Sequence, residues 1–383
     1  MRIAFVSTIL HYPWGGADAL WTKTAARALA EGHAVFLAVS PRTAAHPQIQ
    51  SLVQAGATLH LREKLTTYNG NRAVWGQRLA RWLRRPSSLQ AALDAFAPDH
   101  VLINQGGLFD FLLETGLMAW LRHENVPYTL FCQSGADTDT LDPQLQPTAW
   151  SCADRAHAFG FTSTHNRQLV ERLLGHRLSN ARIVENPVSL GFPVPLPWPS
   201  ENRWRMAVVA RLENRDKALD LLLQAVADVL AGEQNWQLSL FGRGSDEAAL
   251  KHLTHELGLD DRVVFQGFSN DLRSIWQDHH LLLLPSRREG CAIAMLEALF
   301  CGRPVLATPV GGVSDWLKDG SNAFLAPVCD RAGIGAALRK AWDQRNQWSL
   351  MGHAASQTTS QMDPTPERTL LNVITGPAQR AVA

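Results

Sequence analysis

Two glutamates follow a short apolar run of the chain. Glu289 lies in the loop after a strand predicted at 280–284, and Glu297 lies one to two turns into the helix predicted next. Their separation along the helix axis disfavours a shared metal ion, but each carboxylate can accept hydrogen bonds from hydroxyls of one elongated ligand. The amides of Cys291 and Ala292, at the start of that helix, can bind a phosphate or sugar oxygen between them. The alternative is two solvated glutamates on one helix.

Two cations flank another predicted strand end. Arg211 follows the strand predicted at 206–210, and Lys217 precedes the helix predicted at 218–230. Both can reach a diphosphate at this edge of the sheet, because guanidinium and ammonium groups bind phosphate oxygens. Either residue alone is weak evidence, since surface arginine and lysine are usually solvated. Their placement at one sheet edge favours an anion site.

A pair of glycines follows the first predicted strand, 3–8. Gly15 and Gly16 precede a helix predicted to open near Asp18. Glycine lets backbone N–H groups approach an anion closely, and the helix dipole adds partial positive charge. A tight turn between strand and helix is the alternative.

The elements that must position these residues alternate along the chain. Short apolar runs are followed by longer segments of helical periodicity, which is typical of βαβ units and a parallel sheet. Ligands of such sheets bind at the carboxyl ends of the strands, which is where the residues above lie. The predicted strands are 3–8, 34–39, 57–61, 100–104, 128–132, 158–162, 182–184, 206–210, 237–241, 262–265, 280–284, 304–307 and 323–325.

Alternate prolines at 191–199 divide the chain, because they exclude a central strand or helix and favour an extended linker. The fold class we expect is α/β, with two doubly wound parallel-sheet domains that face a central cleft. We predict an N-terminal domain at 1–188, a linker at 189–203, a C-terminal domain at 204–360, and a last segment at 361–383, with a return to the N-terminal domain as one option.

The composition narrows the function classes. The 36 basic and 35 acidic side chains give a net charge of +1, which excludes the broad basic surface of a protein that coats nucleic acid. Five cysteines without a Cys-x-x-Cys pair disfavour disulfides and thiolate metal sites. The N-terminus is typical of a buried strand and not of a signal peptide, and no apolar run approaches about 20 residues. We expect a cytoplasmic protein.

Four features in this order resemble glycosyltransferase family 4, the retaining enzymes of the GT-B fold. They are Gly15-Gly16; Arg211 and Lys217 in an Arg-Leu-acid…Asp-Lys-x-Leu-Asp-Leu-Leu-Leu pattern; Phe241-Gly242-Arg243-Gly244; and Pro285-Ser286…Glu289-x7-Glu297-Ala298-Leu299 with Cys301-Gly302-Arg303-Pro304-Val305 and Gly311-Gly312-Val313 after it. The resemblance covers nearly the whole chain and is strongest from Arg211 to Pro327. It implies two Rossmann-like GT-B domains, the first for the acceptor and the second for the nucleotide sugar.

The resemblance also implies an activity and roles. A hexose would move, with retention and without metal or other cofactor, from a UDP- or GDP-linked donor to a saccharide or lipid-linked acceptor of the cell envelope. Arg211 and Lys217 would neutralise the departing diphosphate. Glu289 would hold a hydroxyl of the hexose, and Glu297 the ribose hydroxyls. The remaining donor contacts would be Gly16, Gly242, Gly290, Cys291, Ala292 and Leu296.

One position departs from the family. Many members have a histidine near the sugar where this chain has Gln133, which can hydrogen-bond a hydroxyl but cannot act as a base. We place Gln133 in the site as a positioning residue. Just beyond it, Asp137-Thr138-Asp139 has the form of a manganese-binding Asp-x-Asp, but the surrounding pattern favours a solvated or acceptor-facing loop, with Asp137 as a candidate sugar or acceptor contact.

Residues 71–86, from Asn71 to Pro86, carry five arginines and no acid opposite a stripe with two tryptophans. The segment is typical of a helix that packs on the N-terminal domain with its arginines in solvent. The sharper alternative is an interfacial helix that binds an anionic membrane surface, so that the protein would lie on the inner face of the cytoplasmic membrane.

Two further classes of function compete with the transferase. An NAD-dependent oxidoreductase on two Rossmann-like domains would need G-x-G-x-x-G, but Glu247 stands where the third glycine after Gly242 and Gly244 belongs. A nucleotide-sugar-binding protein without turnover is the other alternative, motivated by Gln133.

Overall fold

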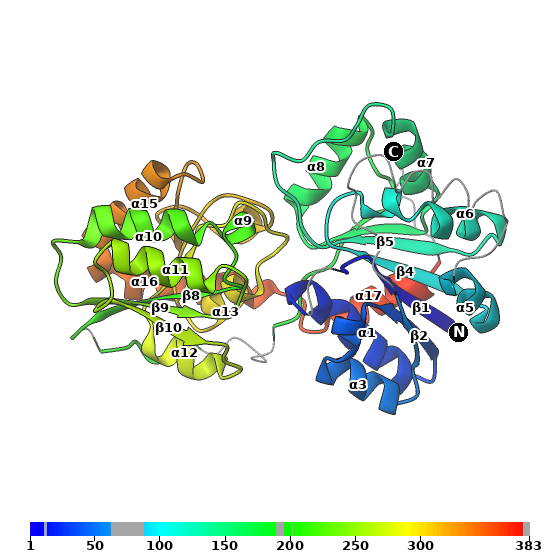
Figure 1. Ribbon diagram of the computed structural model, residues 1–383, viewed down its shortest axis with the longest axis horizontal. Helices are drawn as coiled ribbons and strands as arrows, with labels where there is room; N and C mark the ends of the chain where they lie inside the picture. The colour runs from blue at the N-terminus through cyan, green and yellow to red at the C-terminus, as the bar shows by residue number, and fades with distance from the viewer. Residues whose placement is uncertain (11–13, 63–87, 189–194, 201, 378–383) are drawn as a thin grey trace.

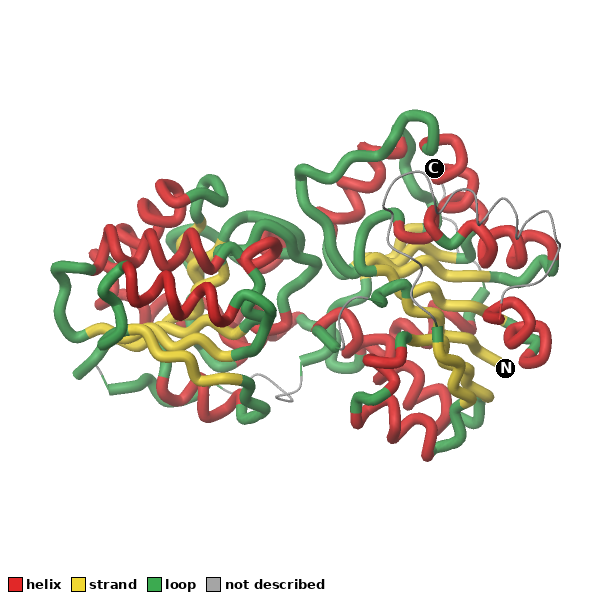
Figure 2. Tube along the Cα trace, viewed as in Figure 1, coloured by secondary structure: helices red, strands yellow, loops and turns green. Residues whose placement is uncertain are grey.

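The structure is a computed structural model that describes residues 1–10, 14–62, 88–188, 195–200 and 202–377. Its described part forms two domains, each built on one parallel sheet (Figure 1). Helices lie on both faces of each sheet, as Figure 2 shows. None of the described helices is long and apolar enough to cross a bilayer. The basic segment 71–86 lies outside the described residues.

The N-terminal domain has a seven-stranded sheet in the order β3-β2-β1-β4-β5-β6-β7. Its strands are β1 Arg2–Ser7, β2 Ala34–Val39, β3 Thr58–Leu61, β4 His100–Gln105, β5 Tyr128–Cys132, β6 Ala158–Phe161 and β7 Ala181–Ile183. Its helices are α1 Gly16–Ala30, α2 Pro41–Ala44, α3 Pro47–Gln54, α5 Ser88–Phe96, α6 Thr115–His123, α7 Gln146–Arg155 and α8 Thr164–Leu174, with a 3₁₀ turn at Asp110–Leu113.

The central strands are apolar on both faces because both faces are covered. Along β1, Ile3 and Phe5 pack with α1 and α3, whereas Ala4 and Val6 pack with α5 and α6 on the other side. All four side chains are at most 1% exposed. This two-sided burial explains why β1 forms a continuous apolar run instead of an alternating one.

The C-terminal domain has a six-stranded sheet in the order β10-β9-β8-β11-β12-β13. Its strands are β8 Trp204–Val209, β9 Trp236–Phe241, β10 Val263–Gly267, β11 Leu281–Leu284, β12 Val305–Ala307 and β13 Ala323–Leu325. Its helices are α9 Asn214–Lys217, α10 Leu219–Leu230, α11 Glu247–Glu256, α12 Leu272–Asp278, α13 Ile293–Phe300, α14 Val313–Trp316, α15 Arg331–Asp343 and α16 Trp348–Thr358, with 3₁₀ turns at Arg345–Gln347 and Thr359–Gln361.

The last helix, α17 (Pro366–Thr375), lies in the N-terminal domain, where it is the red helix beside the blue α1 in Figure 1. Leu370, Leu371 and Ile374 are at most 1% exposed and belong to the core on the α1 side of the sheet. The carbonyl of Val373 is also 3.0 Å from Nε2 of His157. The chain therefore passes between the domains twice.

The predicted fold class is confirmed. Within the described residues each of the thirteen predicted strands forms, with ends that differ by at most two residues. The helix predicted at 218–230 differs, because Ala218 adopts the left-handed conformation (φ 51°) and separates the single turn α9 from α10. An alanine rarely adopts this conformation, so its residue type did not reveal the break.

Candidate active site

The strongest polar cluster lies where β8 and β11 end. These strands are neighbours in the sheet, so the loop that carries Lys217 meets the loop that carries Glu289. Lys217 Nζ is 2.5 Å from Glu289 Oε1, and the Ser286 hydroxyl donates to the same oxygen at 2.7 Å. The Glu289 residue is only 7% exposed. A buried carboxylate with two donors is fixed in one orientation, which is what a substrate-binding group needs.

The two loops are also tied together through their backbones. The N–H groups of Arg287 and Arg288 donate to the carbonyl of Asp216, and the Arg287 guanidinium donates to the carbonyl of Asn214. Both acceptors are in α9, which ends at Lys217. The break after α9 therefore directs the lysine toward the loop that follows β11.

Arg211 lies beside this cluster among acids of its own loop. Its Nη1 is 2.6 Å from Glu213 Oε2, and its Nη2 is 3.6 Å from Asp216 Oδ2. The structure thus places both predicted cations at one sheet edge. In this state carboxylates balance each of them, and an incoming phosphate must compete with those carboxylates.

Glu297 lies within α13 and is 5% exposed. Burial raises the pKa of its carboxyl to about 7. No described side chain donates a hydrogen bond to it. A carboxylate in this environment has unused capacity to accept hydrogen bonds from hydroxyls of a bound ligand.

The start of α13 differs from the prediction. The helix begins at Ile293 with Ala292 as its N-cap, so Cys291 precedes the helix instead of opening it. The side chains of Cys291 and Leu296 are 4% and 0% exposed and pack in the core of the C-terminal domain. A donor can therefore meet these two residues only through their backbone.

Gly290 marks a close contact between the two domains. A Cβ atom at this position would lie 1.7 Å from the carbonyl oxygen of Gln133 and 2.7 Å from the Thr162 hydroxyl. The neighbouring carbonyl of Glu289 accepts from the Gly135 N–H at 3.1 Å and from Asn166 Nδ2 at 3.3 Å. The loop that holds the Glu289 carboxylate is thus docked on the N-terminal domain.

The other predicted glycines have different surroundings. Gly242 has φ 138° and ends β9 so close to β8 that a Cβ would lie 1.8 Å from the carbonyl oxygen of Ala210. Its residue type is therefore explained by packing of the sheet edge. Gly16 is the first residue of α1, and a Cβ there would lie 3.3 Å from Ile293 Cδ1, so the start of α1 faces the start of α13.

Asp18 holds the first turn of α1. Its carboxylate accepts from the Gly15 N–H at 3.0 Å and from Trp21 Nε1 at 3.1 Å. Burial raises the pKa of Asp18 to about 6, although these hydrogen bonds and the charge of Arg211 act in the opposite direction. The influence of Arg211 links the first turn of α1 to the cations of the other domain.

Gln133 is 4% exposed and lies at the end of β5. Its Nε2 donates to Asn104 Oδ1 at 2.8 Å, and its Oε1 has no partner among the described residues. The carbonyl of Gln133 lies next to Gly290, whereas its side chain is partly engaged within its own domain.

The Asp-Thr-Asp segment is divided between two ion-pair clusters. Asp137 Oδ1 is 2.9 Å from His165 Nε2 and 3.7 Å from an Arg172 nitrogen. Asp139 forms a two-pronged ion pair with Arg288 of the other domain, with one of the two contacts at 2.7 Å. Asp137 and Asp139 therefore bind different cations. No group of three or more His, Cys, Asp or Glu suited to a metal ion is found among the described residues.

Several residues of the site were missed from sequence. Ser286 lies within the motif that carried the resemblance, and Asp18 has the position of a helix-capping acid after the glycine pair, so both had a readable signal. Asn166 and the Arg288–Asp139 pair depend on contact between domains, for which the local sequence has no pattern.

Comparison with known proteins finds a family model that matches the C-terminal domain, relatives that are similar in sequence, and solved structures with a similar fold. Residues 203–344 match the family model described as Glycosyl transferases group 1. Over 118 residues the chain is 30% identical to N-acetyl-alpha-D-glucosaminyl L-malate synthase of Bacillus anthracis, which covers 31% of each chain. Over 210 residues it is 29% identical to lipopolysaccharide 1,6-galactosyltransferase of Escherichia coli K12, which covers 52% of this chain and 56% of that protein. The matches thus span about a third to a half of these relatives.

Solved structures match over nearly the full length. HepE of Anabaena, in complex with UDP and glucose, has a TM-score of 0.71 at 17% identity and covers 97% of this chain and 98% of its own. The apo form of the lipopolysaccharide outer core galactosyltransferase WaaB has a TM-score of 0.65 at 16% identity, with 97% and 99% coverage. The C-terminal domain therefore carries the signature of Glycosyl transferases group 1, in a chain whose two domains have the fold of GT-B glycosyltransferases.

Proposed function

We propose that this protein transfers a hexose from a nucleotide diphosphate sugar, UDP- or GDP-linked, to a hydroxyl of a saccharide or lipid-linked acceptor. The products would be polysaccharide, lipopolysaccharide or glycolipid of the cell envelope. The family match of residues 203–344, a relative named as a lipopolysaccharide galactosyltransferase, and the fold shared with a UDP-bound structure support this proposal.

The observation that carries the proposal is the contact of Lys217 and Ser286 with Glu289 where the two domains meet. A donor diphosphate beside Lys217 and Arg211 would compete with their carboxylates for these cations, since it carries two negative charges in one group. The Glu289 carboxylate, still bound by Ser286, would then be open to a hydroxyl of the hexose. The same contact thus explains both donor binding and donor orientation.

Other groups would hold the rest of the donor. Glu297 would accept hydrogen bonds from the ribose hydroxyls, for which its free oxygens and burial suit it. The N-terminus of α1 at Gly16 would contribute its dipole to the diphosphate from the opposite domain. The backbone of Gly290, Cys291 and Ala292 would contact the sugar or a phosphate, with Gly242 and Leu296 beside the nucleotide.

The reaction we propose proceeds with retention and without a metal ion. The bond between the anomeric carbon and the diphosphate breaks, and its electron pair leaves with the diphosphate, whose charge Arg211 and Lys217 stabilise. The acceptor hydroxyl forms the new bond on the same face of the sugar, and its proton passes to the departing phosphate oxygen. No nucleophile of the protein is needed in this scheme.

The domain division supports this assignment of roles. We propose that residues 1–188 bind the acceptor and residues 204–360 the donor, joined by the linker 189–203. Asp137, which is 50% exposed at its side chain, and Gln133 are the acceptor-side or sugar-side contacts that we propose. Gln133→Ala with undiminished turnover would remove that residue from the site.

The direct test is a thermal-stabilisation screen with UDP-, GDP-, ADP- and dTDP-linked hexoses, followed by nucleotide release with candidate acceptors. We expect stabilisation by one donor class and release that requires an acceptor. Proton NMR of the product would report an anomeric configuration equal to that of the donor. Loss of activity in EDTA that Mn²⁺ restores would refute metal independence, and stabilisation by NAD alone would refute the transferase.

Donor binding without turnover is a second candidate, favoured by one observation. Gln133 cannot serve as a base, and its amide nitrogen is already bound to Asn104. A chain that binds donor but releases no nucleotide with any acceptor of the panel would establish this candidate.

Membrane association is a proposal from sequence alone, because residues 71–86 lie outside the described residues. We propose that this basic segment places the protein at the cytoplasmic face of an anionic membrane, near a lipid-linked acceptor. Flotation with anionic vesicles but not with neutral ones is the expected result. Equal behaviour with both vesicle types would refute it.

A further inference from the structure

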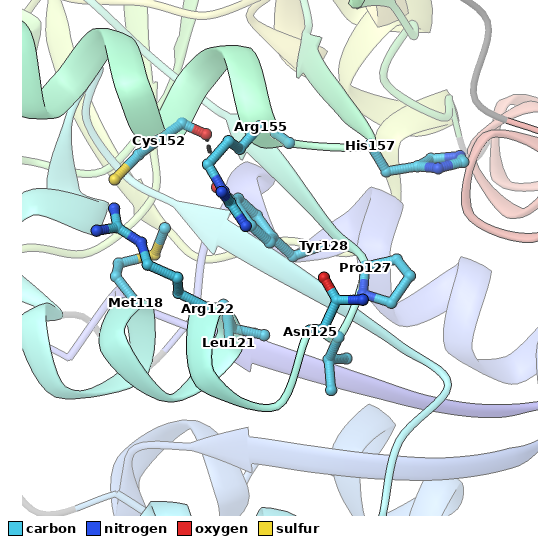
Figure 3. Close-up of a pocket in the computed structure, with 11 residues that line it drawn as sticks. Met118, Leu121, Arg122, Asn125, Pro127, Tyr128, Cys152, Arg155 and His157 are labelled. Carbon is cyan, nitrogen blue, oxygen red and sulfur yellow. Dashed lines mark hydrogen bonds between the residues drawn. The ribbon is translucent and has the colours of Figure 1, made fainter.

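An open pocket lies at the edge of the N-terminal sheet opposite the candidate active site. Its volume is about 280 Å³, and it is lined by the ends of α6 and α7, the turn between α6 and β5, and the first residue of β5 (Figure 3). The amino ends of β5 and β6 form this edge, whereas Gln133 and the domain contact lie at the carboxyl ends. A ligand here is therefore neither donor nor acceptor of the proposed reaction.

Two arginines line this pocket from different helices. Arg122 lies in the last turn of α6 and Arg155 in the last turn of α7. Both act on the same two neighbours: burial raises the pKa of the Cys152 thiol, while Arg122, which also hydrogen-bonds it, and Arg155 lower it. Burial also raises the pKa of the Tyr128 hydroxyl, and the charges of Arg122 and Arg155 lower it by a smaller amount. The two guanidinium groups thus surround one small space.

Neither arginine forms an ion pair with a described residue. No described carboxylate lies within ion-pair distance of Arg122 or Arg155, whereas Arg27, Arg167 and Arg331 each have such a partner. The charge of Asp154 acts on Tyr128 together with the two arginines, but it lies beyond ion-pair distance of both. Two neighbouring cations without a counter-ion repel each other, and this repulsion is relieved when an anion binds between them.

The ordinary role of an arginine in a last helical turn is to cap free carbonyls, and here several of those carbonyls are already bound by other groups. At the end of α7, the carbonyl of Cys152 accepts from the Tyr128 hydroxyl at 2.6 Å. The carbonyls of Ala153 and Ala156 accept from Asn180 Nδ2 at 2.9 and 2.8 Å.

The end of α6 is capped in the same way, by backbone. The carbonyl of Trp120 accepts from the Glu124 N–H at 2.9 Å, and that of Leu121 from the Val126 N–H at 3.1 Å. The two guanidinium groups are therefore not needed at these carbonyls, and apart from the contact of Arg122 with the Cys152 thiol they can bind a ligand.

We propose that this pocket binds the dianionic phosphate of a small phosphate monoester, between Arg122 and Arg155. Two guanidinium forks match the oxygens of one phosphate, and two positive charges favour a dianion over a carboxylate. Met118, Leu121 and Pro127 form an apolar wall for the carbon skeleton of the ester, and Asn125 supplies a polar group at the rim. The pocket volume admits a small ester but no nucleotide sugar.

The test is isothermal titration calorimetry of the full chain with inorganic phosphate and with glucose 6-phosphate. It uses an Arg211→Gln background, so that phosphate at the donor site does not contribute. We expect one molecule bound per chain, with tighter binding of the ester if the natural ligand is a phosphorylated metabolite and equal binding if it is free phosphate. Absence of binding by both probes at millimolar concentration would overturn the proposal.

Variants assign the binding to the pocket. Arg122→Gln and Arg155→Gln, each in the same background, should weaken binding about ten- to hundredfold, because each removes a charged hydrogen-bond donor. Arg42→Gln is the matched control, since Arg42 also lies in a last helical turn of this domain but outside the pocket, and it should bind as the parent does. Equal affinity of all three variants would overturn the proposal.

A chemical-modification experiment on the wild-type protein tests the same site without requiring that any variant folds. Phenylglyoxal modifies accessible arginines, and mass spectrometry of the peptides gives a rate for each one. Phosphate should slow modification of Arg122 and Arg155 severalfold and leave Arg42 unchanged. Unchanged rates at all three positions would contradict the site.

Discussion

Replacement of Glu297 by glutamine tests the burial of this carboxylate. Burial raises its pKa from 4.5 to about 7 in the folded chain, whereas the unfolded chain keeps the ordinary value. Between these two pH values the folded chain binds one more proton than the unfolded chain, so stability falls as pH rises through this window and levels off above it. A separation of about 2.5 between the two pKa values corresponds to about 3 kcal/mol.

Scanning calorimetry of both chains at pH 5, 6, 7 and 8 measures this effect. Glutamine does not titrate, so the variant does not lose this stability as pH rises. From pH 5 to pH 8 the free energy of unfolding of Glu297→Gln should therefore increase relative to that of the wild type by about 3 kcal/mol, or roughly 6–12 °C in melting temperature. Asp18, whose pKa burial raises to about 6, titrates in the same window but is common to both chains and cancels. A temperature difference that stays constant with pH would refute the reasoning.

The affinity of the wild type for nucleotide should, in contrast to its stability, rise with pH. Hydroxyls that donate to Glu297 favour its ionised form, so binding releases a proton and wild-type affinity should rise by up to about a hundredfold from pH 5 to pH 8, beyond the change seen for Glu297→Gln. The phosphates of the nucleotide titrate equally in both experiments. Parallel affinity curves for the two chains would remove Glu297 from the ribose site.

Three further experiments test the candidate active site and the contact between the domains. Gly290→Ala places a Cβ 1.7 Å from a carbonyl oxygen of the other domain. The resulting cost of about 1–3 kcal/mol should lower turnover roughly 5- to 150-fold in steady-state kinetics. Lys217→Met and Glu289→Gln should show a coupling of about 1–3 kcal/mol in a double-mutant cycle of thermal stability, because they are 2.5 Å apart and mostly buried. Arg288→Gln removes the partly exposed ion pair with Asp139, which costs about 1 kcal/mol. The ratio of open to closed arrangements of the two domains should therefore rise roughly fivefold, which small-angle scattering would measure.

Each of these experiments has a matched control in the same domain. Gly232→Ala adds a Cβ that meets nothing within 4 Å. The exposed pair of Lys251 and Glu247 should couple by only about 0.5 kcal/mol. Arg331→Gln breaks an ion pair with Asp228 inside the C-terminal domain and should leave the scattering profile unchanged. A control that matches its test variant would contradict the corresponding prediction.

The strands were predictable because they are buried on both faces. A strand such as β11, with four leucines that are at most 3% exposed, has an apolar sequence that no surface element would have. The edge where Lys217 and Glu289 meet followed from the same rule, since loops after neighbouring parallel strands converge.

The contacts between the domains were not predictable from local sequence. Asp139 and Arg288 are paired across the contact between the domains, and no periodicity or motif relates residues so far apart in the chain. The break at Ala218 was not predicted because a left-handed backbone conformation is expected at glycine or asparagine, not at alanine. Backbone geometry imposed by tertiary contacts decided both features.

The double passage of the chain between the domains has a consequence for recombination. The sequence leaves the N-terminal domain after residue 188 and comes back before α17, so the C-terminal domain is an insertion within the other one. Exchange of that domain between related proteins therefore needs two junctions. A chimaera with a single junction would carry a foreign α17, whose Leu370, Leu371 and Ile374 would have to fit a core with which they had not evolved.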